Sequence, residues 1–297
     1  MSAVLRILRA GPLATVQDGG RFGLLRHGIG ESGPMDRSAF AEAAQGLPLA
    51  GPAGIEFTRA GLDFEVSGEE IMAGFAGGDF RLSIDGKKQA WPGVAKLRDG
   101  ARVAVTPGAA GNYGYVRFNR EIGVTPVLGS RATNCMVGLG GYEGRALRAG
   151  DALALEPVTE VPQAVSRREE GDGPIRFVWG LHADLFSPKL RQRFLSESFE
   201  ISSRLDRMGV RLTDPGGVFM DAHILTLVSD AVVAGDIQIL GDGTPIVLMR
   251  DHQPTGGYPR IATILSADLD RFAQMRPGST LTFQSVSPRN AYAARSR

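Results

Sequence analysis

The stretch "LDFEVSGEEIMAGFAGGDFRLSIDG" (62–86) decides the fold class of this 297-residue chain. Within it, LDFEV (62–66) and FRLSI (80–84) alternate apolar and polar residues, which is the pattern of a strand with one buried face. The Asp-Gly pair at 85–86 follows the second run and predicts a hairpin turn. Comparable runs are YGYVRF (113–118), IRFVW (175–179), IQIL (237–240) and IVLM (246–249). The chain is therefore expected to be mainly β.

Signals for helices are few and short. Asp36 is a residue type that caps helix N-termini, and it predicts a helix that runs to Gly46. Ser187 and Pro188 have the types favoured at the N-cap and first helical position, which predicts a helix of about two turns. Asp268 is expected to start a third helix before Pro277. Only short helices should accompany the strands.

One motif occurs three times, as LRDGARVAV (97–105), LRAGDALAL (147–155) and MRPGSTLTF (275–283). Each copy predicts a turn with glycine at positive φ that leads into a half-buried strand of a barrel or sandwich. The copies favour one type of turn used repeatedly in related β modules. The alternative, that such turns are common before strands of any kind, remains open.

A polar and charged segment, PVTEVPQAVSRREEGDGP (157–174), separates the last strand of the second copy from IRFVW. It has prolines at its ends and no helical or strand period, which is typical of a linker. The sequence therefore predicts an N-terminal β module at 1–160, a linker at 161–174 and a C-terminal cyclophilin-like β-barrel module at 175–297.

Composition excludes several classes of function. Lys and Arg number 33 against 32 Asp and Glu, a net charge of +1, so no basic field favours nucleic acid. The single cysteine, Cys135, cannot form an internal disulfide and is expected to be buried, and four scattered histidines offer no zinc pattern. Arg6 and Arg9 interrupt what would be the apolar part of a signal peptide, and no apolar run is long enough for a membrane helix. We expect a cytoplasmic protein without a metal or a membrane partner.

The familiar catalytic and nucleotide motifs are missing. Gly86-Lys87 lacks the remainder of a phosphate-binding loop, and GLGGYEG (138–144) does not match the dinucleotide fingerprint. The nucleophile motif G-x-S-x-G is absent as well. Any use of a nucleotide would therefore depend on an atypical site or on other chains.

Four clusters of polar residues with glycines remain as candidate sites. They are GIGESGPMD (28–36), which TVQDGGRFG (15–23) precedes, PVLGSRATN (126–134) running into GLGGYEGR, SSRLDRMGVRL (202–212), and MRDHQPTGGYPRIATI (249–264). Their glycines would let backbone N–H groups approach a ligand, and their arginines suit a carboxylate or phosphate. A structural interpretation stays open for each cluster: Asp36 as a helix cap, Arg207 in a salt bridge with Asp206, and Tyr258-Pro259 as a turn.

Together, and in this order along nearly the whole chain, the four clusters resemble the biotin-dependent carboxyltransferase-like family. This family is also called allophanate hydrolase subunit 2 or KipA-like, and it includes the C subunit of 5-oxoprolinase. The resemblance implies a mainly β fold of cyclophilin-like barrel modules. It also implies a KipI-like partner, similar to the B subunit of 5-oxoprolinase, that completes the active site. In the oxoprolinase system a third chain, the A subunit, joins them.

The resemblance leaves three functions open. In the oxoprolinase branch the complex opens the lactam of 5-oxoproline to glutamate with ATP hydrolysis. In the carboxylase branch the module accepts carboxybiotin and moves CO₂ to an amide nitrogen, such as that of urea. In the third, a KipA-like regulator antagonises a KipI-like kinase inhibitor without catalysis. No A-M-K-M biotinylation motif occurs, so no covalent cofactor is expected. ATP would act with partner subunits, and carboxybiotin would arrive on a partner chain.

The candidate site residues follow from residue type and from the resemblance. Asp206, Asp251 and His252 are the candidates for proton transfer, because lactams and ureas react poorly unless the carbonyl is polarised and a proton is managed. The amides of Gly256 and Gly257 are candidates for polarising the carbonyl, and Arg207 or Arg260 for holding a substrate carboxylate. The remaining candidates for binding a small amide or lactam are Ser32, Met35, Asp36, Ser130, Arg131, Gln253, Thr255 and Tyr258.

Two segments depart from the family pattern. VRFNREI (116–122) stands where relatives carry a glycine pair, and AAQGLPLAGPAG (43–54) replaces a shorter end to the first helix. If those glycines line the pocket, the substrate has changed or catalysis has been lost.

Overall fold

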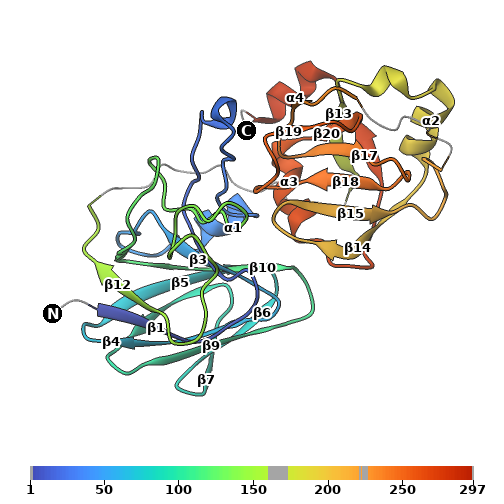
Figure 1. The fold of residues 1–297 in the computed structure, drawn as a ribbon. Helices are drawn as coiled ribbons and strands as arrows, with labels where there is room; N and C mark the ends of the chain where they lie inside the picture. Colours follow the sequence, from blue (N-terminus) through green and yellow to red (C-terminus); the bar gives the residue numbers. More distant parts are fainter. Residues whose placement is uncertain (1–2, 160–172, 221, 223–226, 296–297) are drawn as a thin grey trace. The chain divides into compact units, whose positions relative to one another are not determined.

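The computed structural model describes residues 3–159, 173–220, 222 and 227–295, and strands dominate it (Figure 1). The chain forms two compact units, one of Met1–Phe22 with Ser32–Arg167 and the other of Gly23–Glu31 with Arg168–Arg297. The expectation of a mainly β fold with a few short helices is confirmed. The linker expected at 161–174 lies outside the described residues except for its last two, so the boundaries at 160 and 175 stay predictions.

The described residues of the first unit form two antiparallel sheets. One has the strand order β11-β12-β1-β4-β9-β6-β7 and the other β2-β3-β10-β5-β8. The strands are β1 (Ala3–Ala10), β2 (Thr15–Gln17), β3 (Gly54–Thr58), β4 (Leu62–Ser67), β5 (Ile71–Gly77), β6 (Phe80–Ile84), β7 (Lys87–Gln89), β8 (Gly93–Leu97), β9 (Arg102–Pro107), β10 (Tyr113–Phe118), β11 (Glu121–Ile122) and β12 (Ala152–Glu156).

The stretch quoted first behaves as its pattern predicts. Leu62, Phe64 and Val66 are fully buried on β4, while the residues between them are partly exposed. Asp85 and Gly86 both have positive φ, 51° and 75°, which is the requirement of a tight hairpin turn between β6 and β7.

The three copies of the repeated motif are confirmed as turns that lead into strands. Gly100, Gly150 and Gly278 have φ values of 75°, 94° and 83°, in the left-handed region that glycine reaches without strain. They precede β9, β12 and the strand β21 (Thr280–Leu281). The motif is thus used in both units.

Helix α1 (Arg37–Glu42) starts where it was expected and ends early. The Asp36 carboxylate accepts a hydrogen bond from the Ala39 amide at 2.9 Å and caps the helix. After Glu42 the hydrogen bonds tighten to the three-residue spacing, as in Gln45 N–H to Glu42 C=O at 2.8 Å. The segment up to Gly46 is therefore a series of turns, not a continuation of the helix.

The second unit is built on one sheet in the order β21-β14-β15-β18-β17-β20-β13-β22, and strands β16 and β19 form a separate short pair. Strands β13 and β22 pair in parallel, and the other pairs are antiparallel. The remaining strands are β13 (Ile175–Trp179), β14 (Phe199–Leu205), β15 (Gly209–Thr213), β16 (Asp230–Ala231), β17 (Asp236–Ile239), β18 (Pro245–Leu248), β19 (Thr255–Gly256), β20 (Arg260–Ile264) and β22 (Phe283–Ser285).

The described residues of this unit form three α-helices: α2 (Pro188–Ser196), α3 (Ser266–Ala273) and α4 (Pro288–Arg295). Short 3₁₀ turns occur at η1 (Leu25–His27) and η2 (Ala183–Leu185). Helix α2 begins at Pro188 with Ser187 as its cap, as predicted. The prediction that Asp268 starts α3 is wrong, because Asp268 lies in the first turn and its carboxylate binds Arg176. In the described part of the chain, no helix is long and apolar enough to cross a membrane.

Candidate functional site

A pocket of about 490 Å³ lies in the second unit, over strands β14, β15, β17 and β18. It brings together three of the residues expected from the sequence, Asp206, Gln253 and Tyr258. Gln238 also lines it, a residue that the sequence motifs did not single out. Apolar side chains from the same strands, among them Leu205 and Leu248, complete the wall. The pocket therefore combines an apolar surface with a few polar groups, as small-molecule sites do.

Strand alternation explains why these side chains reach the pocket. Val210 and Leu212 are buried in the core, so Arg211 between them points to the opposite face of β15. Arg211 pairs with Ile246 on β18, and Ile246 pairs with Gln238 on β17. This row of cross-strand neighbours lines the pocket.

Asp206 lies in the turn between β14 and β15. Its Oδ1 accepts hydrogen bonds from the amides of Met208 at 2.7 Å and Gly209 at 3.1 Å, which fixes the carboxylate. Its Oδ2 accepts no hydrogen bond from any residue that the structure describes. Asp206 thus presents one anchored and one available carboxylate oxygen at the pocket.

Gln238 presents a buried donor to the same pocket. Its side chain is 2% exposed, and its Oε1 accepts from Gln253 Nε2 at 3.4 Å. Its Nε2 is buried and has no hydrogen-bond partner among the described residues. A buried amide donor without an acceptor costs roughly 1–3 kcal/mol, which a ligand oxygen would recover. The sequence signal that could have revealed Gln238 as a site residue was its position between two isoleucines of a buried strand.

Arg207 and Asp251 form a buried ion pair with each other. Arg207 Nε lies 2.7 Å from Asp251 Oδ2, and both side chains are almost fully buried. The alternative interpretation of Arg207, as the salt-bridge partner of Asp206, is therefore wrong, because the Asp206 carboxylate binds backbone amides of its own turn. With both Asp251 oxygens on the guanidinium, this pair holds the turn before β15 to the loop after β18.

His252 and Arg260 are also engaged within the protein. His252 is buried, and its Nδ1 lies 2.6 Å from the carbonyl oxygen of Gln253. The Arg260 guanidinium binds Asp230 at 2.7 Å and lies 3.5 Å from Asp236. Neither His252 nor Arg260 lines the pocket.

The glycine loop after His252 is partly ordered by a strand pair. Thr255 and Gly256 form β19 and pair with β16. The Gly257 carbonyl accepts a hydrogen bond from the Leu227 amide at 2.7 Å. The role of the Gly256 and Gly257 amides in polarising a carbonyl stays a prediction.

The other expected site residues lie in the first unit and are mostly buried: Ser32, Met35, Asp36, Ser130 and Arg131. The Glu56 carboxylate accepts from the Met35 amide at 2.7 Å and from the Tyr115 hydroxyl at 2.9 Å, and that hydroxyl accepts from the Asp36 amide. Burial, reinforced by the charge of Glu56, raises the pKa of Tyr115 well above its usual value. This network fixes the chain that leads into α1.

The loop at 126–134 is tied down in the same unit. The Asp18 carboxylate accepts from the Ser130 hydroxyl at 2.6 Å and from the Arg131 amide at 2.5 Å, and the Arg131 guanidinium forms an ion pair with Glu121. Cys135 is only half-buried, contrary to expectation, because it lies in the turn that follows this loop. In the described ranges, no group of three or more His, Cys, Asp or Glu side chains gathers as a metal site.

The segment that replaces the family's glycine pair is part of the core. Strand β10 is buried along its whole length, and the Arg117 guanidinium lies over the Phe40 ring at 4.6 Å. Burial lowers the pKa of Arg117 to about 10. None of residues 116–122 lines the pocket of Asp206 and Gln238. Their size therefore does not alter that pocket directly.

Known proteins of similar sequence match almost the whole chain. The chain is 34% identical to the 5-oxoprolinase C subunit of Escherichia coli over 98% of this chain and 94% of that protein. It is 31% identical to the 5-oxoprolinase C subunit of Haemophilus influenzae over 97% of this chain and 93% of that protein. Urea amidolyase of Lachancea kluyveri is 30% identical over 93% of this chain and only 16% of that protein.

Solved structures share the same architecture. The urea amidolyase of K. lactis superposes with a TM-score of 0.86 at 25% identity, over 97% of this chain and 19% of that one. The Kluyveromyces lactis urea carboxylase gives the same TM-score and identity over 97% of this chain and 28% of that one. The chain thus spans less than a third of those longer enzymes. The model of the carboxyltransferase domain, subdomain A and B, matches residues 27–285, so the chain belongs to the carboxyltransferase domain family.

Proposed function

We propose that this carboxyltransferase-type chain is one component of a 5-oxoprolinase-type complex, which opens the lactam of 5-oxoproline to glutamate with ATP hydrolysis. The observation that carries the proposal is the pocket in which the Gln238 Nε2 donor and the available Asp206 oxygen meet an apolar wall. The similarity to two 5-oxoprolinase C subunits over nearly their full length favours this branch.

The two polar groups match the needs of lactam opening. A lactam carbonyl is a poor electrophile, and a hydrogen bond from Gln238 Nε2 to its oxygen would stabilise the charge that develops there. Asp206 Oδ2 would take a proton from the attacking water as its oxygen bonds to the carbonyl carbon. The C–N bond then breaks, and the nitrogen leaves as an amine after it takes the proton back from Asp206 Oδ2. The products are a carboxylate and an ammonium group.

ATP and further chains complete the proposal. Because the sequence has no nucleotide-binding loop, ATP would act with the partner subunits. The proposed partners are a KipI-like protein, similar to the B subunit of 5-oxoprolinase, and a third chain similar to its A subunit.

A second candidate function is carboxyl transfer from carboxybiotin to an amide such as urea. It is favoured by the similarity to urea amidolyases and to the urea carboxylase structure. The pocket suits the ureido ring of biotin as well as a lactam. Both are cyclic amides whose carbonyl oxygen can accept from Gln238 and whose ring can lie on an apolar side chain such as Leu240. When bound, carboxybiotin would supply the carboxyl group from a partner chain.

The deciding experiment is co-expression with the proposed partner subunits, followed by measurement of ATP-dependent glutamate release from 5-oxoproline. We expect turnover that falls roughly 100-fold or more in Asp206→Asn, since general bases contribute about 10²–10⁴. Asp184→Asn is the matched control, because Asp184 is 95% exposed and lies outside the pocket.

Other outcomes of this experiment identify other functions. Turnover of an amide that requires bicarbonate and a biotinylated chain would replace the first proposal with the second. A stable complex without either activity would contradict both and favour the KipA-like regulator.

A further inference from the structure

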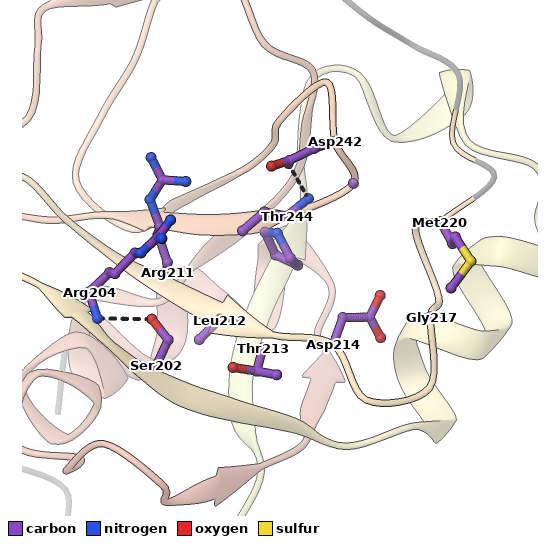
Figure 2. Close-up of a pocket in the computed structure, with 12 residues that line it drawn as sticks. Ser202, Arg204, Arg211, Leu212, Thr213, Asp214, Gly217, Met220, Asp242 and Thr244 are labelled. Atoms are coloured by element: carbon purple, nitrogen blue, oxygen red, sulfur yellow. Dashed lines mark hydrogen bonds between the residues drawn. The ribbon is translucent and has the colours of Figure 1, made fainter.

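A second pocket, of about 390 Å³, lies beside the β14–β15 hairpin, and Figure 2 draws the residues that line it. Arg204 on β14 and Arg211 on β15 line both pockets. Figure 2 shows these two arginines toward one end of the second pocket, with Asp214 and Met220 toward the other. The hairpin register places them close together, since Leu205 pairs with Val210. Two guanidinium groups thus stand where the pockets meet.

These arginines differ from the other arginines discussed in this unit. Arg207 binds Asp251, Arg260 binds Asp230 and Arg176 binds Asp268, each at 2.7 Å or less. Arg204 and Arg211 form no ion pair or side-chain hydrogen bond with any residue in the described part of the chain. Their donors remain available to a ligand.

The surroundings add hydrogen-bonding groups and a competing charge. The hydroxyls of Ser202 and Thr213 line the same pocket, and Ser202 Oγ accepts from the Arg204 amide at 3.1 Å, so its own proton can be donated elsewhere. The Thr244 amide chiefly, and the Arg211 charge more weakly, lower the pKa of Asp242. Asp242 is exposed and ionised beside Arg211 at neutral pH, where it competes with an incoming anion.

We propose that Arg204 and Arg211 form a binding site for an oxyanion, a carboxylate or phosphate group. Paired guanidinium forks match such groups in charge and geometry. Arg207 and Arg260, the residues expected from the sequence to hold a carboxylate, are already engaged in ion pairs.

The shared position of the two arginines extends the proposal to the substrate. A lactam bound at Gln238 and Asp206 would place a ring carboxylate within reach of the same wall that both pockets share. This step rests on the proposed function and names the substrate class as an amide that bears an anionic group. A neutral amide such as urea gains nothing from these arginines. The alternative source of the oxyanion is a free or esterified phosphate.

The test is calorimetric titration of the full chain, purified alone, with three probes: inorganic phosphate, 5-oxoproline, and 2-pyrrolidinone, the same ring without the carboxylate. We expect phosphate and 5-oxoproline to bind competitively, and 2-pyrrolidinone to bind at least tenfold more weakly than 5-oxoproline. Arg204→Gln and Arg211→Gln should each lower the affinity for both anions about tenfold. Asp242→Asn should raise the affinity for both anions, since it removes the negative charge of Asp242 that competes with them.

Arg191→Gln on α2 is the control, because Arg191 pairs with Asp184 on the surface. This substitution should leave the affinities for all three probes unchanged. The site is overturned if neither anion binds. It is also overturned if both anions bind to Arg204→Gln and to Arg211→Gln as tightly as they bind to the unsubstituted chain. Binding of phosphate without 5-oxoproline supports the oxyanion site and overturns the substrate assignment. Because phosphate binding needs no partner subunit, a complex without turnover would refute the proposed function while this site stands.

Discussion

At the scale of single residues, the candidate site depends on polar atoms for which the described residues provide no partner. Gln238 Nε2, one Asp206 oxygen and the Arg204–Arg211 pair face pockets, whereas the more conspicuous Arg207, Asp251 and Arg260 are used within the protein. A charged group that is already paired gains little from a ligand, since breaking a buried pair is strongly unfavourable. The available groups therefore mark the site better than the density of polar residues does.

The position of the Gln238 amide depends on a glycine. A Cβ added at Gly256 would lie 2.4 Å from Gln238 Nε2, so Gly256→Ala must displace that amide. We expect a loss of about 1–3 kcal/mol in the free energy of unfolding, typical of overpacking, and weaker 5-oxoproline binding. Denaturant unfolding and calorimetry measure both. Gly19→Ala is the control, because its added Cβ meets no atom within 4 Å; equal effects of the two substitutions would refute this explanation.

The lowered pKa of His182 leads us to expect that the stability of the fold depends on pH. Its Nδ1 accepts from the Arg260 amide at 3.3 Å, and burial, followed by the Arg260 charge, lowers its pKa. A folded-state pKa below the unfolded value means that the unfolded chain binds more protons, so stability falls as pH drops below about 6.5. His182→Gln keeps an acceptor without titrating and should flatten the change in unfolding free energy between about pH 7 and 5. Identical pH profiles for the two proteins would contradict this assignment.

At the scale of elements, strands whose residues alternate or form a continuous run of large apolar side chains were predictable, including the fully buried β10, and β5 was not. β4 and β6 alternate in burial and match LDFEV and FRLSI. β5 escaped prediction because its alanines and glycines give neither a period of two nor a run of large apolar side chains. Gly74 explains that composition, since an added Cβ would lie 2.0 Å from the Ala43 carbonyl oxygen just after α1. Close packing between elements, which a local pattern does not encode, decided this strand.

Substitutions of Asp36 can distinguish its role as the N-cap of helix α1 from a role in binding a ligand. Asp36→Ala removes the acceptor for the Ala39 amide and should cost about 1 kcal/mol of unfolding free energy. Asp36→Asn keeps an acceptor oxygen and should cost much less. Ser187→Ala, which removes the cap of α2, is the matched control in the other unit. Denaturant unfolding measures all three; an Asp36→Asn chain that keeps its stability and loses turnover would instead support substrate binding.

At the scale of the whole molecule, the candidate site could be predicted only in part. The clusters at 202–212 and 249–264 do meet at one pocket, through Asp206, Gln253 and Tyr258. The sequence does not show that Arg207 binds Asp251, 44 positions away, or that Gln238 from a third segment completes the pocket. The first fact depends on the pairing of β15 with β18 and the second on the pairing of β17 with β18, and local sequence patterns specify neither.

Each unit has its own core, and this predicts a local response to core mutation. The main apolar cluster consists of residues between Ala3 and Leu155. The second unit has a cluster of aromatic rings around Phe194, which stacks on Phe283 at 4.8 Å. Phe194→Ala removes a fully buried ring and should cost about 3–5 kcal/mol in that unit. Hydrogen exchange followed by mass spectrometry should show lost protection in β14 and β22, with β4 and β9 unchanged.

The reciprocal variant makes this prediction decisive. Phe64 is fully buried in the first unit and packs against Phe118 with ring centroids 6.1 Å apart. Phe64→Ala should therefore expose β4 and β10 to exchange and leave β14 protected, because protection follows the local free energy of opening. If either substitution lowered protection equally in both units, the two cores would open as one cooperative structure, and the assignment of separate folding units would be wrong.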